Sequence, residues 1–105
     1  MPQFSVHRNP NPDTRAAYPL LLDVQSDLIA GLRTRVVVPL CPAPAMKGKL
    51  ITKLMPVFEI DGKQYAMLTP QLAGVSSKQV GAKVADLAQR RDEIIAALDL
   101  LITGM

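Results

Sequence analysis

Few side chains in this 105-residue sequence have the types and spacing that enzymatic chemistry needs. Cys41 and His7 are each the only residue of their type. A Cys41 thiolate would therefore have His7 as its only imidazole base, and neither residue can build a zinc site without further ligands. We interpret Cys41 as a packed, inert thiol. His7 lies on the outward side of an expected strand and is interpreted as a surface or interface residue rather than a proton carrier.

Asp23 and Asp27 in the segment DVQSD are spaced like a carboxylate pair. As a general acid and base they would need environments that separate their pKa values. The favoured interpretation is structural, with Asp23 ending a strand and Asp27 capping the next turn. The P-loop, dinucleotide-binding, zinc-protease and serine-hydrolase motifs are all absent from the sequence. The sequence thus predicts no catalytic residue, no metal site and no cofactor, and it favours action by binding.

The composition predicts one domain over residues 1–105, because 49% of the residues are hydrophobic and only 20% are charged. Nine prolines restrict continuous helix and central strand. A single cysteine excludes an internal disulfide and favours a reducing, cytoplasmic compartment. The N-terminal segment has no secretory pattern, and no apolar stretch approaches the roughly 20 residues of a membrane span.

Positive charge is concentrated in the first half of the chain. Residues 1–55 contain seven Lys and Arg against three acids, whereas residues 56–105 contain five against six. The sequence has two Tyr, two Phe and no Trp, so platforms for stacking nucleic-acid bases are scarce. An acidic partner segment fits this surplus as well as a phosphate backbone does, and a solvated loop fits it better than either.

Strand signals fill the first two-thirds of the chain. Alternating patterns predict strands over residues 4–7, 18–24 and 35–40, and the proline-rich residues 41–49 are expected to form a loop. Asp61-Gly62 between two alternating runs predicts a two-residue type I′ hairpin over residues 56–68. That register places Phe58 opposite Tyr65. These short strands favour a small, curved antiparallel sheet or barrel.

The hydrophobic period becomes helical near the end of the chain. Leu87, Ile94, Leu98 and Leu101 recur at helical spacing, and Gly104 is a suitable residue for the helix end. A capping box of Asp86 with Gln89 predicts a helix start at residues 86–88, after an extended segment over 79–85. The expected fold is a β-rich domain with a C-terminal α-helix.

Five segments together resemble the CcdB family of bacterial toxins. They are MPQFSVH at the start, YPLLLDVQSDLI at 18–29, TRVVVPL at 34–40, LMPVFEIDGKQYAML at 54–68 and VADLAQRRDEIIAALDLLITGM at 84–105. The resemblance implies an SH3-like antiparallel barrel with a C-terminal helix, assembled as a homodimer. It also implies a toxin that catalyses nothing, binds the DNA gyrase A subunit and traps the cleaved-DNA complex. A cognate antitoxin with a disordered tail would neutralise it, and operator DNA would be bound only through the toxin–antitoxin complex.

The resemblance also implies positions for these contacts. The gyrase contact falls on Thr103, Gly104 and Met105, with Leu28, Ile29 and Asp99 as further candidates. Thr103 stands where the plasmid-borne toxin of the family has a tryptophan, so a typical interface hot spot is missing. Leu101 and Ile102 are expected at the dimer axis because the segment IIAALDLLI has more aliphatic residues than one stripe must bury. The antitoxin tail is expected along the basic first half, near Arg33, Lys47, Lys49 and Lys53.

Two other function classes stay open on the sequence alone. The first is a MazF-like endoribonuclease, in which Arg33 or Arg35 would have to act with Asp23. The second is a module that binds a partner but poisons nothing, for which the missing tryptophan is the only hint.

Overall fold

The computed structural model describes residues 2–29, 31–46 and 53–104. It contains one α-helix, α1 (Arg91–Thr103), after a series of strands and short 3-10 turns. The strands are β1 (Ser5–Arg8), β2 (Leu20–Asp23), β3 (Thr34–Pro42), β4 (Val57–Ile60), β5 (Lys63–Met67), β6 (Ala73–Ser76) and β7 (Lys83–Asp86). The turns are η1 (Asp27–Ile29), η2 (Ala43–Met46), η3 (Thr69–Gln71), η4 (Ser77–Gln79) and η5 (Ala88–Arg90).

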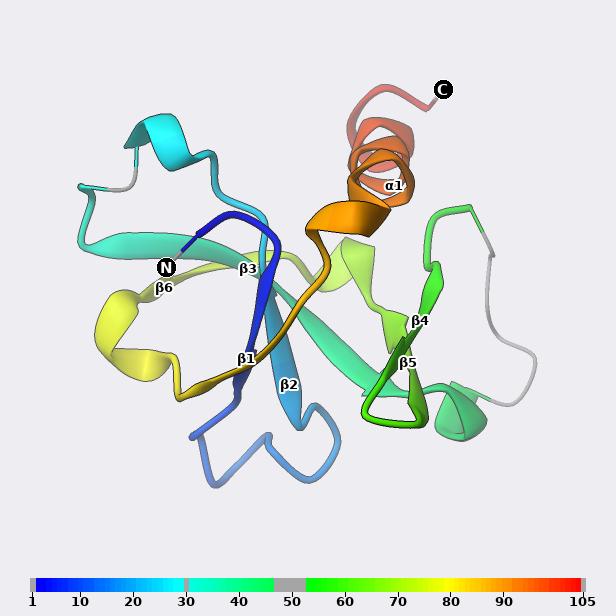
Figure 1. The fold of residues 1–105 in the computed structure, drawn as a ribbon, viewed down its shortest axis with the longest axis horizontal. Helices are drawn as coiled ribbons and strands as arrows, with labels where there is room; N and C mark the ends of the chain where they lie inside the picture. The colour runs from blue at the N-terminus through cyan, green and yellow to red at the C-terminus, as the bar shows by residue number, and fades with distance from the viewer. Residues whose placement is uncertain (1, 30, 47–52, 105) are drawn as a thin grey trace.

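The strands form one antiparallel sheet that curls into a half-barrel (Figure 1). Its order is β4-β5-β3-β2-β1-β7, and β6 also pairs with β3. The connection from β6 to β7 therefore runs from one side of the sheet to the other. Figure 1 places α1 at one end of this sheet, beside the β4–β5 hairpin. The predicted fold class, a β-rich barrel-like sheet with a C-terminal helix, is confirmed.

The long strand β3 shares one of its sides between two partners. Its first half pairs with β6 over residues 34–37, and its second half pairs with β5 over residues 40–42. Pro39 lies between these two regions, and its carbonyl accepts a hydrogen bond from Leu68 N at 3.0 Å. Because the N and O atoms of one strand residue point to the same side, the Pro39 nitrogen also faces this gap. A proline is thus tolerated in a central strand without loss of a ladder bond.

The predicted β4–β5 hairpin is confirmed in its register and in its turn. Phe58 pairs with Tyr65, and Ile60 pairs with Lys63. Asp61 and Gly62 both have positive φ, at 52° and 79°, as a type I′ turn requires.

The strand predicted over residues 35–40 is longer in the structure, and one strand was not predicted at all. Cys41 and Pro42 belong to β3 and pair with Ala66 and Tyr65 of β5, not to a loop. The short strand β6 carries no clear alternation in its sequence AGVS. Both features depend on a partner strand that is distant in sequence, which local patterns do not report.

One face of β1, β2 and β3 packs under α1 and the hairpin. The core there includes Val6, Leu22, Leu40, Phe58 and Ile94, all fully buried. The opposite face is buried as well, since Ser5 and His7 of β1 are 0% and 5% exposed. The prediction of a half-buried first strand with an outward His7 is therefore wrong. The segment between β6 and β7 covers this second face, and its Gly81 carbonyl contacts the His7 ring.

The helix begins later than predicted and without the predicted capping box. Asp86 Oδ1 accepts a hydrogen bond from Ala88 N at 2.7 Å, and the chain then makes the 3-10 turn η5 before α1 begins at Arg91. The capping box that the structure does contain is at η4, where Ser76 and Gln79 cap each other. The predicted end is confirmed, because Gly104 has a φ of 75° and its N–H bonds to Leu100 O at 3.0 Å.

Gly81→Ala should destabilise the protein by about 1–3 kcal/mol, the usual cost of forcing extra atoms into a packed site. A Cβ at residue 81 would lie 2.7 Å from the backbone oxygen of Arg8, and Gly81 N donates to that same oxygen. Urea unfolding measures the change. Gly74→Ala is the control, since no heavy atom lies within 4 Å of its added Cβ. An equal effect of both substitutions would contradict the steric explanation.

Candidate functional site

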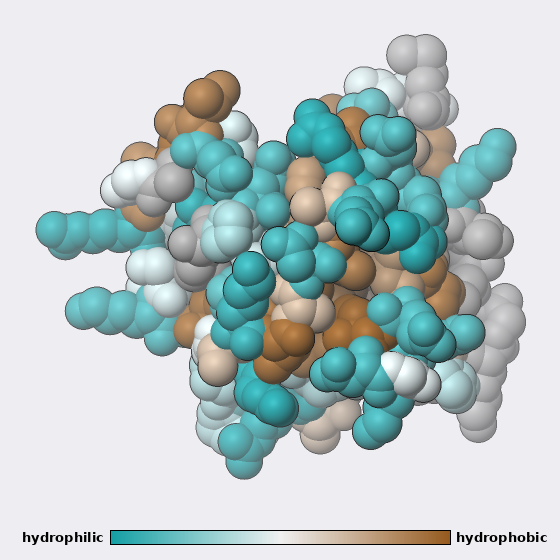
Figure 2. All heavy atoms as spheres, in the orientation of Figure 1, coloured by the Kyte–Doolittle hydropathy of each residue, from teal (hydrophilic) through white to brown (hydrophobic). Residues whose placement is uncertain are grey.

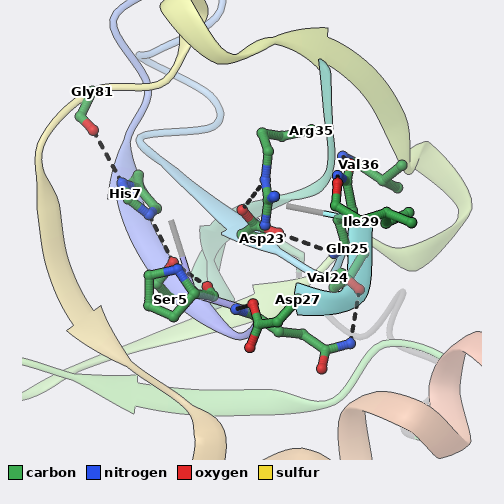
Figure 3. A network of polar contacts seen from close by, with 12 residues as sticks. Ser5, His7, Asp23, Val24, Gln25, Asp27, Ile29, Arg35, Val36 and Gly81 are labelled. Atoms are coloured by element: carbon green, nitrogen blue, oxygen red, sulfur yellow. Dashed lines mark hydrogen bonds and ion pairs between the residues drawn. The ribbon is translucent and has the colours of Figure 1, made fainter. Parts of the chain in front are cut away.

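The residues that could have formed a catalytic site are buried inside the sheet. Asp23 and Arg35 form an ion pair, with Oδ2 and Nε 2.7 Å apart and side chains 0% and 3% exposed. Figure 3 shows this pair between β2 and β3, with Gln25 beside it. Asp23 Oδ1 is also engaged, because it accepts the Gln25 N–H at 2.9 Å. Asp23 and Arg35 thus hold two strands together and cannot reach an RNA substrate.

His7 is likewise a structural residue. Its Nε2 lies 2.8 Å from Ser5 Oγ, and its Nδ1 lies 3.0 Å from Gly81 O. Ser5 Oγ also donates to Pro2 O at 2.7 Å. Figure 3 shows the imidazole ring spanning from β1 to the segment before β7. The arrangement resembles a serine–histidine pair, but a fully buried Ser5 cannot attack a substrate.

Cys41 is a packed thiol, as predicted. It is 5% exposed and packs in a small apolar cluster with Ala66 and Leu68. Burial raises the pKa of the Cys41 thiol above its ordinary value. Because the thiolate is the reactive form, a raised pKa lowers the reactivity of this residue near neutral pH.

The end of α1 leaves its apolar side chains uncovered. Of the 13 helical residues only Ile94 and Ala97 are buried, whereas Leu101 and Ile102 are 38% and 77% exposed. Beyond them Thr103 and Gly104 are exposed, and Thr103 Oγ1 donates to Asp99 O at 2.7 Å. Met105, the third residue expected at the chain end, lies outside the described residues.

A second apolar element stands on the loop between β2 and β3. Leu28 and Ile29 lie on η1 and are 95% and 50% exposed, and neighbouring Leu32 is 54% exposed. We call residues 26–29 and 31–33 the arm. Figure 1 shows η1 and α1 at the same end of the molecule but apart from each other. The structure therefore brings η1 and the end of α1, with the described residues of the predicted gyrase contact, to one end of the molecule without joining them into one patch.

Several hydrogen bonds fix the arm to the sheet. Gln25 Nε2 donates to Ile29 O at 2.9 Å, and Gln25 Oε1 accepts from Val36 N at 3.1 Å. Asp27 Oδ1 accepts from Gln3 N at 2.7 Å. Asp27 is therefore a structural residue that ties the arm to the N-terminal segment. It does not cap the next turn as predicted, because Ser26 Oγ accepts the Leu28 N–H there. The interpretation of Asp23 as the end of a strand is confirmed. Gln25 and Leu32 were not singled out by sequence reasoning, because a lone glutamine and a lone leucine carry no periodic signal.

The predicted antitoxin-contact residues are only partly visible. Arg33 and Lys53 are exposed, whereas Lys47 and Lys49 lie outside the described residues. Arg33 directly precedes β3, and Lys53 lies in the segment that leads to β4. The start of β3 and the segment before β4 lie on opposite sides of the molecule in Figure 1. The structure does not bring Arg33 and Lys53 together.

The described ranges contain no cluster of three or more His, Cys, Asp or Glu that could hold a metal ion. In the same ranges, no helix has the length and apolar character needed to cross a membrane.

These features define a class: a small half-barrel with a C-terminal helix, whose chemistry-bearing residues are structural and whose exposed apolar side chains lie on a braced loop and a helix end. Exposed apolar groups that lie together are typical of surfaces that contact another molecule. A family model described as CcdB protein matches residues 3–104, nearly the whole chain. The chain belongs to the CcdB family. Membership supports the general role of a gyrase-poisoning toxin of a toxin–antitoxin system, which acts by binding and is not itself an enzyme.

Arg35→Met should destabilise the protein by about 3–5 kcal/mol, because it leaves the Asp23 carboxylate buried and uncompensated. Adding Asp23→Leu removes that charge, so the double variant should be more stable than the sum of the two single changes predicts. Urea unfolding of the wild type, the two single variants and the double variant gives the coupling energy between Asp23 and Arg35. Additive single effects would contradict the buried ion pair as a coupled unit.

Proposed function

We propose that this protein poisons DNA gyrase by binding the A subunit and trapping the complex in which the DNA is cleaved. The observation that carries the proposal is the family match over residues 3–104, together with exposed apolar groups on the arm and the end of α1. Leu28 and Ile29 of the arm and Asp99, Thr103, Gly104 and Met105 of the chain end are the proposed contacts. A gyrase-directed action takes place in the cytoplasm, where that enzyme works.

The burial of Asp23 and Arg35 argues against the endoribonuclease alternative. An RNA-cleaving site needs a base and a phosphate-stabilising cation that converge on an accessible substrate. Here the two side chains are 0% and 3% exposed and neutralise each other. Arg33 is exposed, but without Asp23 it has no partner in that scheme.

Growth arrest and gyrase chemistry test the proposal together. Induced expression should arrest growth, and the purified protein should cause gyrase to accumulate cleaved DNA from a supercoiled plasmid. Labelled RNA incubated with the protein should remain intact. Arrest without gyrase-dependent cleavage would contradict the target, and cleaved RNA would support the endoribonuclease instead.

The chain-end contact is tested by Gly104→Glu, which adds a side chain and a charge at the proposed surface. We expect reduced gyrase cleavage. Gly104 has a φ of 75° and open space around it, so any L-residue there adds backbone strain of about 1–2 kcal/mol. Gly104→Asn is the control, because asparagine tolerates this conformation best among non-glycine residues. If the Gly104→Glu variant still causes gyrase to accumulate as much cleaved DNA as the wild type does, the contact lies elsewhere.

We further propose a homodimer in which Leu101 and Ile102 of two copies meet across a two-fold axis. The support is the 77% exposure of Ile102, together with the half-exposed Leu101, on a helix that packs only by its other side. Light scattering at micromolar concentration should give about twice 11.4 kDa.

Ile102→Lys should shift that mass toward the monomer without loss of the fold, since Ile102 is largely exposed. Leu72→Lys is the control, because Leu72 is exposed on a different element. A wild-type monomer, or an Ile102→Lys variant that stays dimeric, would contradict this interface.

A cognate antitoxin with a disordered, acidic or mixed-charge tail completes the proposal. The support is the family's toxin–antitoxin pairing and the surplus of Lys and Arg in residues 1–55, which includes Arg33, Lys47, Lys49 and Lys53. We propose that the complex of toxin and antitoxin represses its own operon, with operator DNA bound only through that complex.

A further inference from the structure

The exposed apolar surface of the arm extends beyond Leu28 and Ile29, the two residues of the proposed gyrase contact. Leu28, Ile29 and Leu32, which we call the arm tip, are 95%, 50% and 54% exposed. They are half of the six large apolar side chains that are exposed among the described residues. A single exposed leucine needs no explanation, but three on one short loop mark an interaction surface.

Two consecutive turns place the arm tip residues beside one another. Ile29 N donates to Ser26 O at 3.1 Å, and Leu32 N donates to Ile29 O at 3.2 Å. Leu32 is therefore brought back next to Ile29 rather than extended away from it. Figure 2 shows apolar side chains projecting together where Figure 1 places η1.

The arm tip is held in place before any partner binds. Gln25 is 5% exposed, and its carboxamide joins Ile29 O to Val36 N, one group on the arm and the other on β3. Ser26 Oγ accepts from Leu28 N at 3.2 Å, and Gln3 N donates to Asp27 Oδ1. A loop that is ordered in advance loses less conformational entropy on binding.

The chain end offers less than the arm tip does. The four aromatic residues of the sequence, Phe4, Tyr18, Phe58 and Tyr65, all lie outside the arm and outside α1. Thr103 is a small residue whose hydroxyl already bonds to Asp99 O. Interface hot spots lie where side chains fill well-packed, desolvated pockets, and the arm tip presents larger apolar side chains for such a pocket than Thr103 does.

We propose that the arm tip is the principal gyrase-binding element of this protein, with Leu32 as an anchor and Gln25 as the residue that positions it. This inference rests on the proposed function and adds two residues to it. The partner surface that fits is an apolar pocket that takes Leu28, Ile29 and Leu32. A carboxylate at its rim would meet Arg33, which is exposed directly after Leu32.

Leu32→Ser tests the anchor by direct binding to the purified gyrase A subunit. We expect affinity to fall at least about tenfold, as for a hot-spot residue. Leu32→Met should keep most of the affinity, because it preserves apolar volume. Leu72→Ser is the matched control on another element and should change affinity less than about threefold. Thermal unfolding should show all three variants folded.

A double-variant cycle tests Gln25. Gln25→Met keeps the length of the side chain but removes both hydrogen bonds, so we expect weaker gyrase binding and faster amide exchange at Val36 N. If Gln25 acts by positioning the arm tip, Gln25→Met should cost much less affinity in the Leu32→Ser background than in the wild type. A purely structural role would give the same fold-change in both backgrounds.

The outcomes separate this inference from the function on which it rests. A wild-type chain that does not bind the gyrase A subunit would overturn both. Binding that is unchanged by Leu32→Ser would overturn the inference alone. If Leu32→Ser changes the molecular mass by light scattering but not the gyrase affinity, the arm tip is a contact between copies of this chain. That result would also overturn the inference.

Discussion

The buried carboxylate of Asp23 is the constraint around which the structure is arranged. A charge without solvent contact needs both a counter-ion and hydrogen-bond donors. Arg35 Nε and Gln25 N supply them at 2.7 Å and 2.9 Å, and the Asp23 carbonyl accepts from Phe4 N at 2.6 Å. The N-terminal segment, β2 and β3 therefore meet at this one residue. The arm begins three residues after it, at Ser26.

This arrangement connects the interior of the sheet to the arm. The backbone N–H of Gln25 is held by Asp23, and its side chain holds Ile29 O on the arm. A well-packed apolar pair can match or exceed the stability of a buried ion pair, so stability alone does not account for Asp23 and Arg35. What an apolar pair could not supply is a directed acceptor for Gln25 N. The hydrogen bond from Gln25 N to Asp23 thus fixes the residue whose side chain holds the arm.

Local signals in the sequence predicted the parts of the fold that depend on neighbouring residues. Asp61-Gly62 specifies its turn by itself, because both residues tolerate positive φ. Gly104 ends α1 for the same reason. The burial of Ser5 and His7 could not be predicted in this way, since the Gly81 segment that covers them lies 74 residues further along the chain. β6 and the end of β3 were missed because their pairing is equally remote in sequence.

The residues of the candidate site likewise differ in how far the sequence could predict them. Leu28, Ile29 and the chain end came from resemblance to the family, and the structure shows that Leu28, Ile29, Thr103 and Gly104 are exposed. Sequence reasoning paired Asp23 with Arg33 or Arg35 only as the residues an RNA-cleaving site would need. Only the strand register shows that Asp23 and Arg35 meet in the interior. Leu32 and Gln25 gave no signal, because their roles arise from two turns and a side-chain bridge.

The way α1 is attached explains how its end can serve a partner. An isolated helix of 13 residues is marginal in water, so tertiary contacts must hold it. Ile94 and Ala97 are fully buried, and the Arg91 guanidinium lies 5.7 Å from the centre of the Phe4 ring. Just before the helix, Arg90 lies 4.9 Å from the Phe58 ring and bonds to Glu93 through both carboxylate oxygens. These contacts all fall before residue 98.

The last turn of α1 lies beyond these contacts, and its Leu101 and Ile102 side chains are 38% and 77% exposed. Leu101, Ile102 and Thr103 can contact another molecule without loosening the core, because the anchoring contacts precede them. The arm has the complementary construction, with its polar groups bonded to the sheet and its apolar groups exposed. A partner that engages both elements meets surfaces whose positions the sheet has already fixed. Binding through these two elements would then cost little ordering of this chain.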